Sequence, residues 1–394
     1  MEKKEKKIYF LYSVLLNIYT FSKIISSSYI DKMFFISVGN ISDIINYICI
    51  VGLGSLFLCQ NKIPKKKFLI IIIITIFLGI ISIKFIDKTL ILTYFFIISF
   101  PQKISIKKVA KSLFFCFAIL ITLIISASCL EIIKDYTFFQ HNTMRHSFGF
   151  SSANSLANAV CICLLLYSYF KYDKWTIINN FIYLLCIVTI YYFTRSRLAF
   201  LIAVLNLVLI NTFKTIKNKD IKEKIQKIVF FLSTYLIPFL SIFSIAITIY
   251  FSNNSNSKLF ATINELFTGR LKWMIQYYKD YGIHLVGQQI ETVSLKKSIE
   301  LGLSWKNIDN AYLLFSIKYG IIFLIGFNYM YIKVGKMIKN NNNFNKAFLI
   351  IAFGLMGLTE NFLIIIGYNF TLFFIAEMIN GHFHKIIEEE KFEK

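Results

Sequence analysis

Charged residues are scarce in this sequence of 394 residues. They make up 16% of its positions, whereas hydrophobic residues make up 57% and aromatic residues 17%. An average soluble domain is about a quarter charged. Long apolar runs return so often that no soluble domain of about 100 residues fits between them. The shortage of charge therefore excludes an ordinary soluble protein and indicates a polytopic membrane protein.

Patterns typical of metal sites and disulfides are also lacking. The seven cysteines form no C-x-x-C pair and show no cysteine–histidine spacing of a metal site. All seven fall in or at the ends of apolar runs, so we interpret them as packing residues and infer neither a disulfide nor a metal. The sequence has no internal repeat, which weighs against a transporter built from two related halves.

Apolar runs near the bilayer-crossing length of roughly 20 residues recur along the whole chain. Twelve spans are predicted, at residues 8–28, 40–59, 68–84, 89–101, 112–131, 154–170, 177–193, 197–213, 228–251, 310–332, 346–360 and 363–380. The N-terminal "MEKKEKK" and its apolar continuation lack a small-residue cleavage site, which favours an uncleaved first helix over a signal peptide. We expect an all-α polytopic fold in three parts: helices in 1–251, one large late extracytoplasmic loop in 252–309, and three helices with a cytoplasmic tail in 310–394.

The net charge of +22 has two interpretations. A basic chain can bind nucleic acid, but here the basic residues are parcelled into short connections and form no single patch. Both termini and five alternate connections hold 27 of the 43 basic residues. The positive-inside rule then predicts that these segments face the cytoplasm, and that the remaining 16 basic residues lie on the outer side or at span edges.

Arginine is rare, with four residues against 39 lysines, and all four belong to the outer group: Arg145, Arg195, Arg197 and Arg270. A plain positive charge needs only lysine, whereas the guanidinium fork binds phosphate or carboxylate oxygens bidentately. We therefore predict fixed anion recognition on the outer side of the membrane. Two alternatives remain: chance placement, and headgroup contacts by Arg195 and Arg197.

A helix is predicted within the outer loop, in "TGRLKWMIQYYKDYG". Thr268 is its expected N-cap, Gly282 its C-terminal stop, and its apolar face holds Leu271, Met274, Ile275 and Tyr278. Free backbone N–H groups at this N-terminus, beside Arg270, predict an anion site. A second short helix is expected around residues 293–302.

Polar residues at the outer ends of several spans complete the candidate site. Besides the four arginines they are His146, Gly149, Asn154, Asp309, Asn310 and Glu360. Each has a structural alternative: Asn154, Thr194 and Asp309 suit helix N-caps, Gly149 suits a turn, and His146 suits a solvated loop. Their joint placement on one side leads us to expect one cavity that holds Arg145, Arg195, Arg270 and Asp309.

The ordered motifs "RHSFGFSSAN", "TRSR", "TGRLKW" with "HLVGQ", and "DNAYLLFSIKYG" resemble those of the Wzy-type polysaccharide polymerase and O-antigen ligase superfamily. That family has about a dozen spans in a GT-C-like fold, with a large late extracytoplasmic loop. Asp309 stands where the family often has histidine, so either a histidine-base mechanism does not apply to this chain or the histidine's role passes to this carboxylate.

The resemblance implies a metal-independent, inverting glycosyltransferase without cofactor in the bacterial cytoplasmic membrane. It would polymerise repeat units of O-antigen, capsule or exopolysaccharide, with undecaprenyl pyrophosphate as the leaving group. Arg145, Arg195, Arg197 and Arg270 would bind the pyrophosphate, while Gly149, Asn154 and Asn310 would support the site. Asp309, then Glu360, then His146 would accept the proton. A chain-length regulator and a flippase are implied partners.

Three other functions stay open. An O-antigen ligase would transfer the finished glycan to a lipid A core. A lipid-linked oligosaccharide flippase or other transporter would be expected to have related halves, broken helices or polar residues near mid-membrane. A membrane-anchored assembly factor would not need the outer arginines.

Overall fold

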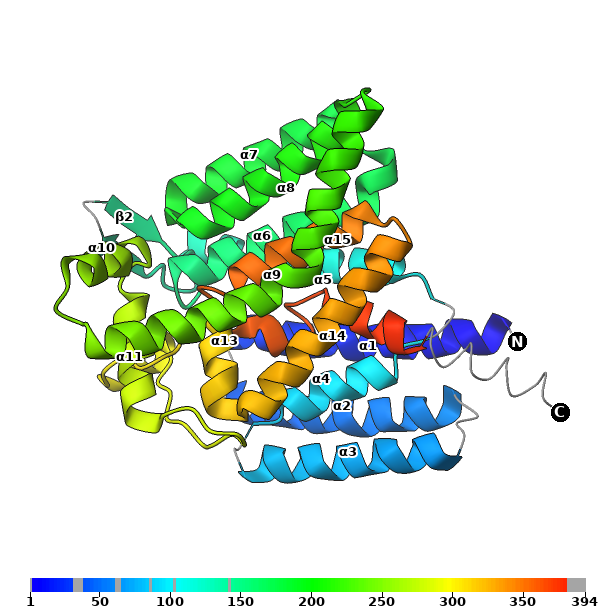
Figure 1. Ribbon diagram of the computed structural model, residues 1–394, viewed down its shortest axis with the longest axis horizontal. Helices are drawn as coiled ribbons and strands as arrows, with labels where there is room; N and C mark the ends of the chain where they lie inside the picture. Colours follow the sequence, from blue (N-terminus) through cyan, green and yellow to red (C-terminus); the bar gives the residue numbers. More distant parts are fainter. Residues whose placement is uncertain are drawn as a thin grey trace. The chain divides into compact units, whose positions relative to one another are not determined.

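The computed structural model describes residues 2–30, 38–60, 65–84, 87–101, 104–140 and 143–380 (Figure 1). The described residues are 77% helical, and the sheet found in them has two strands. Eight of the described helices are long and apolar enough to cross a membrane. The prediction of an all-α membrane protein is thereby confirmed, whereas the number of twelve spans stays a prediction.

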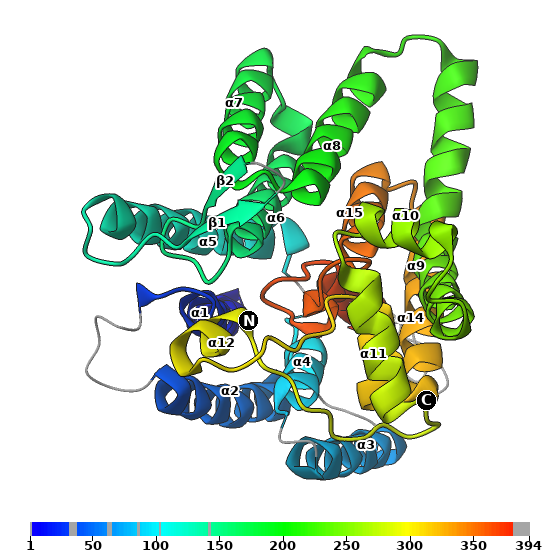
Figure 2. The ribbon, with the colours of Figure 1, turned by 90° about the vertical axis from the view of Figure 1, so that its left-hand side faces the viewer.

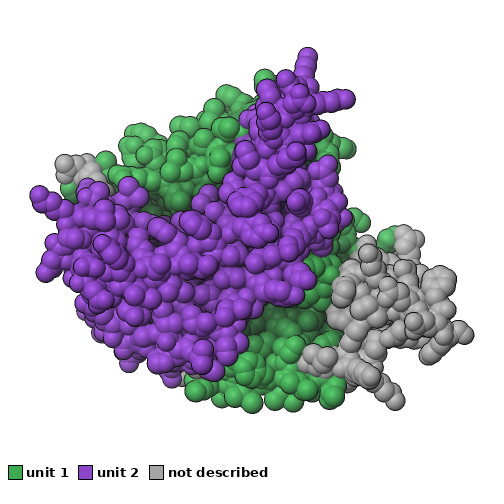
Figure 3. Space-filling view, viewed as in Figure 1, with its two compact units in different colours: residues 1–208, 364–394 green, residues 209–363 purple. Residues whose placement is uncertain are grey.

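The chain folds into two compact units, which Figure 3 shows in different colours. The first unit comprises residues 1–208 and 364–394, and the second comprises residues 209–363. This division differs from the predicted three parts, because the boundary falls inside a helix, α8 (Arg197–Thr215). The segment 252–309, expected as a loop domain of its own, belongs to the second unit together with the helices on either side of it.

Helices make up most of the first unit. They are α1 (Glu2–Ser26), α2 (Val38–Gln60), α3 (Lys65–Lys84), α4 (Thr89–Ile98), α5 (Ile106–Cys129), α6 (Ala153–Lys171) and α7 (Ile177–Thr194), followed by the start of α8. α2 lies beside α1 and α4, and α5 packs on α6 (Figure 1). Buried aromatic side chains join these helices: Tyr12 of α1 donates a hydrogen bond of 2.9 Å to the carbonyl of Phe96 in α4.

A β-hairpin connects α5 to α6. Its strands, β1 (Thr137–Gln140) and β2 (Thr143–His146), are antiparallel, with Phe138 opposite Arg145. β2 contacts the end of α7 (Figure 2). The chain then turns at Gly149, whose φ of +79° favours glycine, and a Cβ there would lie 2.4 Å from Ile133 Cδ1. Gly149 thus lies in a turn that accepts no larger residue.

The second unit is built on the 35-residue helix α9 (Lys219–Asn253). α14 (Ile321–Asn340) and α15 (Phe344–Met356) pack on it. The segment between α9 and residue 309 contains α10 (Lys258–Leu266), α11 (Arg270–Tyr281) and α12 (Leu295–Leu301). α11 lies against α9 and α10 (Figure 2). α12 confirms the short helix expected at 293–302, whereas α10 was not predicted.

The prediction for α11 is correct in outline and wrong in two details. Gly282 ends the helix as expected, and Leu271, Met274 and Ile275 are buried. The N-cap, however, is Gly269, which has a φ of +82°. Thr268 precedes it and also has a positive φ, of 54°. Tyr277 is buried in place of Tyr278, and its hydroxyl donates to the Glu291 carbonyl at 2.8 Å.

The tenth predicted span, 310–332, is not one helix. It consists of α13 (Ala311–Leu314), a π-helical segment η3 (Phe315–Tyr319), a break at Gly320 and then α14. Gly320 has φ +90°, and a Cβ on it would lie 2.5 Å from the Leu285 carbonyl oxygen. The amide of Ile321 donates to the His284 carbonyl at 3.0 Å. The first amides of α14 have no carbonyl acceptor within their own helix, and the backbone of the loop at residue 284 supplies one.

The eleventh and twelfth predicted spans also differ from the structure. α15 ends at Met356, short of residue 360. A 3-10 turn, η4 (Phe362–Ile364), follows, and regular helix returns only at residues 372–380. In the irregular stretch, the Asn369 side chain accepts hydrogen bonds from the amide of Thr371 at 3.1 Å and from its hydroxyl at 2.6 Å. Such local side-chain bonds compete with helix formation.

Candidate functional site

The first unit holds Arg145 between two helix ends, an arrangement we name the Arg145 site. Its Nε donates to the Thr194 carbonyl at 2.7 Å, and its Nη2 donates to Asn154 Oδ1 at 2.6 Å. Thr194 is the last residue of α7, so its carbonyl belongs to the group that a helix leaves without internal partners. The positive guanidinium also interacts favourably with the negative, C-terminal end of the α7 dipole. Arg145 thus fixes the end of α7 beside the first turn of α6.

Helix capping explains why Asn154 is available to Arg145. Ser152, in extended conformation, is the N-cap of α6 and accepts from the Ser155 amide at 3.0 Å. The alternative that Asn154 serves as N-cap is therefore wrong, because Ser152 occupies that position. Thr194 is likewise no N-cap: it ends α7, and its hydroxyl donates to the Ile190 carbonyl at 2.7 Å.

Arg195 and Arg197 follow directly, and both are exposed. Arg195 adopts a left-handed conformation with φ +51° and reverses the chain between α7 and α8. Its guanidinium lies 5.2 Å from the centroid of the Tyr192 ring, a cation–π distance. Arg197 begins α8, where the first backbone N–H groups of the helix lack internal partners. Two exposed guanidinium groups therefore accompany a helix N-terminus at one end of this helical layer.

A small, half-open groove lies between α6, α7 and α8, with enclosed room for about one water molecule. It is lined by Ala157, Val160, Cys161 and Leu164 of α6, Ile187, Ile190, Tyr191 and Thr194 of α7, and Ser196, Ala199, Phe200 and Ala203 at the start of α8. Small side chains on α6 and α8 leave the space, and its walls are mainly apolar. Thr194 and Ser196 form part of the lining, so the groove reaches the helix ends at which Arg195 and Arg197 lie.

His146 forms a close pair with a residue that the sequence did not single out. His146 Nδ1 lies 2.6 Å from Asp135 Oδ2, and Asp135 Oδ1 accepts from the amides of Ser147 at 3.0 Å and Phe148 at 2.8 Å. The two side chains are 33% and 24% exposed. The interpretation of His146 as a solvated loop residue is therefore wrong. Because neighbouring residues of a strand point to opposite faces, Arg145 and His146 diverge.

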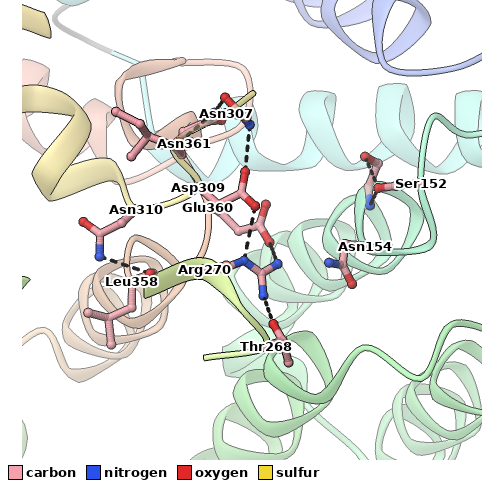
Figure 4. A network of polar contacts seen from close by, with 12 residues as sticks. Ser152, Asn154, Thr268, Arg270, Asn307, Asp309, Asn310, Leu358, Glu360 and Asn361 are labelled. Carbon is pink, nitrogen blue, oxygen red and sulfur yellow. Dashed lines mark hydrogen bonds and ion pairs between the residues drawn. The ribbon is translucent and has the colours of Figure 1, made fainter. Parts of the chain in front are cut away.

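In the second unit, Arg270 is surrounded by polar side chains that we name the Arg270 cluster (Figure 4): Thr268, Arg270, Asn307, Asp309, Glu360 and Asn361. Arg270 Nε donates to Asp309 Oδ2 at 3.3 Å, and Nη1 donates to Thr268 Oγ1 at 2.6 Å. Nη2 lies 3.8 Å from Glu360 Oε1. Asn307 Nδ2 donates to Asp309 Oδ1 at 2.7 Å, and Asn361 Nδ2 donates to Asn307 Oδ1 at 3.3 Å.

One guanidinium and two carboxylates give the Arg270 cluster a formal charge of −1. Their side chains are partly accessible, with 16% exposure for Arg270, 20% for Asp309 and 19% for Glu360. Burial raises the pKa of Asp309, and the Arg270 guanidinium and the Asn307 amide oppose this rise. Arg270 is thus already engaged by carboxylates, and an anionic ligand would have to compete with them.

Asn310 has a structural role. It is almost fully buried and caps α13, since its Oδ1 accepts from the Leu313 amide at 2.9 Å. Its Nδ2 donates to Ser244 Oγ at 3.0 Å and to the Leu358 carbonyl at 3.1 Å. The alternative that Asp309 is the N-cap is therefore wrong, and its carboxylate is left to Arg270.

The predicted site residues fall into two groups. Arg145 and Asn154 are in direct contact in the first unit, where His146, Gly149, Arg195 and Arg197 also lie. Arg270, Asp309 and Glu360 come together in the second unit, where Asn310 lies next to Asp309 in sequence. The expectation of one cavity that holds Arg145, Arg195, Arg270 and Asp309 draws on both units and stays a prediction.

Neither group gathers the ligands of a metal centre: within the described residues, no three His, Cys, Asp or Glu side chains are placed to hold a metal ion. The local chemistry of the two groups is instead that of cationic forks, carboxylates and an apolar groove. Comparison of the chain with family models, with curated proteins and with solved structures gave no match.

Proposed function

We propose that this chain is a membrane glycosyltransferase that polymerises glycan repeat units carried on polyprenyl pyrophosphate. The observation that supports the proposal best is the pair of exposed arginines, Arg195 and Arg197, between α7 and α8, two helices that expose apolar side chains such as Val188 and Leu201. A polyprenyl pyrophosphate requires an apolar surface for its chain and cations for its head, and this part of the first unit offers both.

In this proposal the two exposed arginines bind the pyrophosphate. Arg195 and Arg197 offer guanidinium donors, and the first turn of α8 adds backbone N–H groups. Negative charge accumulates on the departing pyrophosphate as the C1–O bond of the donor sugar breaks, and fixed donors stabilise that charge. Arg145 supports the site by holding the end of α7, because its Nε and Nη2 donate to Thr194 and Asn154.

The acceptor hydroxyl loses a proton as it attacks C1, and Asp309 is the proposed proton acceptor. Burial raises the pKa of this carboxyl, which makes it a stronger base than an exposed aspartate. Glu360 is the second candidate and His146, oriented by Asp135, the third. Attack from the side opposite the pyrophosphate would invert the anomeric centre. An O-antigen ligase would use the same donor chemistry with a different acceptor.

A lipid-linked oligosaccharide flippase is the second candidate function, and one feature of the fold favours it. The segment from α13 to α14 is interrupted at Gly320, and the stretch after η4 contains the fully buried polar residues Asn369 and Thr371. Interrupted helices with polar groups are common where transporters bind substrate.

Reconstitution tests these functions against one another. Liposomes that contain the full chain and a synthetic polyprenyl-pyrophosphate repeat unit, without nucleotide sugar or ATP, should yield a ladder of products on a gel. The ladder should weaken by about 10²-fold in the double variant Arg195→Gln, Arg197→Gln, because the leaving group loses its charge-assisted donors. Lys258→Gln, which removes an exposed charge from α10, serves as the matched control. Movement of the unit across the bilayer without transfer would identify a flippase, and transfer only to a supplied lipid A core would identify a ligase.

A further inference from the structure

Two of the three tryptophans of this chain lie together beside the Arg270 cluster. The rings of Trp273 and Trp305 meet edge to face, with centroids 5.2 Å apart and an interplanar angle of 80°. Trp273 lies on α11, three residues after Arg270. Trp305 lies four residues before Asp309, in the irregular segment between α12 and α13. The tryptophan pair and the Arg270 cluster thus come from the same two stretches of chain.

α11 and the segment that ends at Asp309 contact each other and together form one surface. Residues three apart on a helix share a face, so Arg270 and Trp273 point the same way from α11. Two contacts join this helix to the segment before α13: Arg270 with Asp309, and Trp273 with Trp305. The side chain of Asn307 also reaches Asp309, to which its Nδ2 donates at 2.7 Å. The result is a strip with an aromatic end and a polar end.

The indoles of this strip are available to a ligand. Both are partly exposed, and in the described chain neither indole N–H donates a hydrogen bond. Trp175 provides the contrast, since it is 8% exposed and donates to Asn180 Oδ1 at 2.7 Å. An edge-to-face pair also leaves flat indole surfaces that the partner ring does not cover. Amphipathic aromatic groups with unused donors are typical of recognition surfaces.

We infer that the tryptophan pair and the Arg270 cluster form a subsite for a pyranose ring of the acceptor glycan. A pyranose has a C–H face, which a flat indole buries, and hydroxyl groups, which carboxylates and amides bind. Asp309, Glu360 and Asn307 supply those groups in the strip. The formal charge of −1 favours a neutral or amino sugar over a phosphate. The inference rests on the proposed function for the identity of the ligand, although sugar binding is measured separately from transfer.

Intrinsic fluorescence provides the test. The full chain carrying Trp175→Phe, purified in detergent, reports only on Trp273 and Trp305. It is titrated with methyl pyranosides of glucose, galactose and mannose, with N-acetylglucosamine and N-acetylgalactosamine, and with inorganic pyrophosphate. We expect saturable quenching by at least one sugar and none by pyrophosphate. Adding Trp305→Ala should weaken the affinity at least tenfold, and Trp305→Phe, which keeps a flat ring, should retain most of it.

Three results would overturn the inference: no sugar changes the fluorescence, Trp305→Ala leaves the affinity unchanged, or brominated phospholipid quenches both indoles while sugars do not. The last result would make the pair part of a membrane-interface belt. The inference and the proposed function fail separately. Sugar binding without a product ladder would reject the polymerase and keep the subsite, whereas a ladder without sugar quenching would reject the subsite alone.

Discussion

Replacement of Arg270 by glutamine should destabilise the fold, and more at neutral than at acidic pH. The substitution leaves Asp309 and Glu360 close together without their shared cation. Removing one partner of a buried ion pair costs about 3–5 kcal/mol, and an exposed pair contributes about 0–1 kcal/mol. Because the three side chains are 16–20% exposed, we expect a loss between these limits, about 1–3 kcal/mol at about pH 7.

The pH dependence follows from the pKa of Asp309. Burial raises this pKa and Arg270 lowers it, so the substitution raises the pKa further. A carboxyl group whose folded-state pKa exceeds its unfolded-state pKa contributes full stability only below the unfolded pKa. That contribution is lost as pH rises through the folded pKa. The difference in unfolding free energy between the variant and the parent should therefore shrink as the pH falls toward the unfolded pKa of an aspartate, about 3.9.

Thermal unfolding of the two proteins in detergent measures the effect, with a shift of about 1 °C expected for each kcal/mol in a chain of this length. Lys272→Gln removes an exposed charge from the same helix and is the matched control. The double variant Arg270→Gln, Asp309→Asn should recover part of the lost stability, because it also removes a stranded charge. An equal loss at neutral and at acidic pH, or no loss at about pH 7, would refute this account of the Arg270 cluster.

Two further substitutions probe the backbone turns. Gly320→Ala should cost about 3 kcal/mol or more, because its Cβ would meet the Leu285 carbonyl at 2.5 Å in a backbone conformation of φ +90°. Gly326→Ala in the adjoining helix α14 meets nothing within 4 Å and should unfold at the parent temperature or above; equal melting of the two variants would contradict this view. Asp135→Ala should cost about 1–3 kcal/mol, since it leaves two amides and the His146 ring without their acceptor. Asp135→Asn retains one acceptor oxygen and should cost less in the same assay, and a reversed order would be inconsistent with the observed bonds.

Hydropathy predicted the membrane class and most helices, because the length and apolar character of a segment are local properties. Helix interruptions are different. Gly320 and Gly326 both lie in the predicted span "AYLLFSIKYGIIFLIGF", yet only the former ends a helix. The cause is a loop far away in sequence, whose carbonyls at His284 and Leu285 accept from the first amides of α14. A window that sums hydropathy contains no information on such a contact.

For the candidate site too, the sequence indicates single residues but not the contacts between them. Arg270, Asp309 and Glu360 could each be found as a polar residue at the edge of an apolar run, but their pairing depends on three separate segments that meet in the fold. Asp135 was missed altogether. A single acid in a connection has no signature, and only the hairpin that follows it brings His146 back to its side chain.

The rarity of arginine predicts that the four arginines bind anions, and the structure limits this prediction to two of them. Arg145 uses its fork on a helix-end carbonyl and an amide, and Arg270 uses its fork on a hydroxyl and carboxylates. Both arginines use the planar guanidinium group that lysine lacks, and the groups they bind there belong to the protein itself. Loss of activity at either position would therefore not separate ligand binding from folding. Arg195 and Arg197 are exposed, so substitutions there disturb the fold least. The assignment of a pyrophosphate site depends on these two residues.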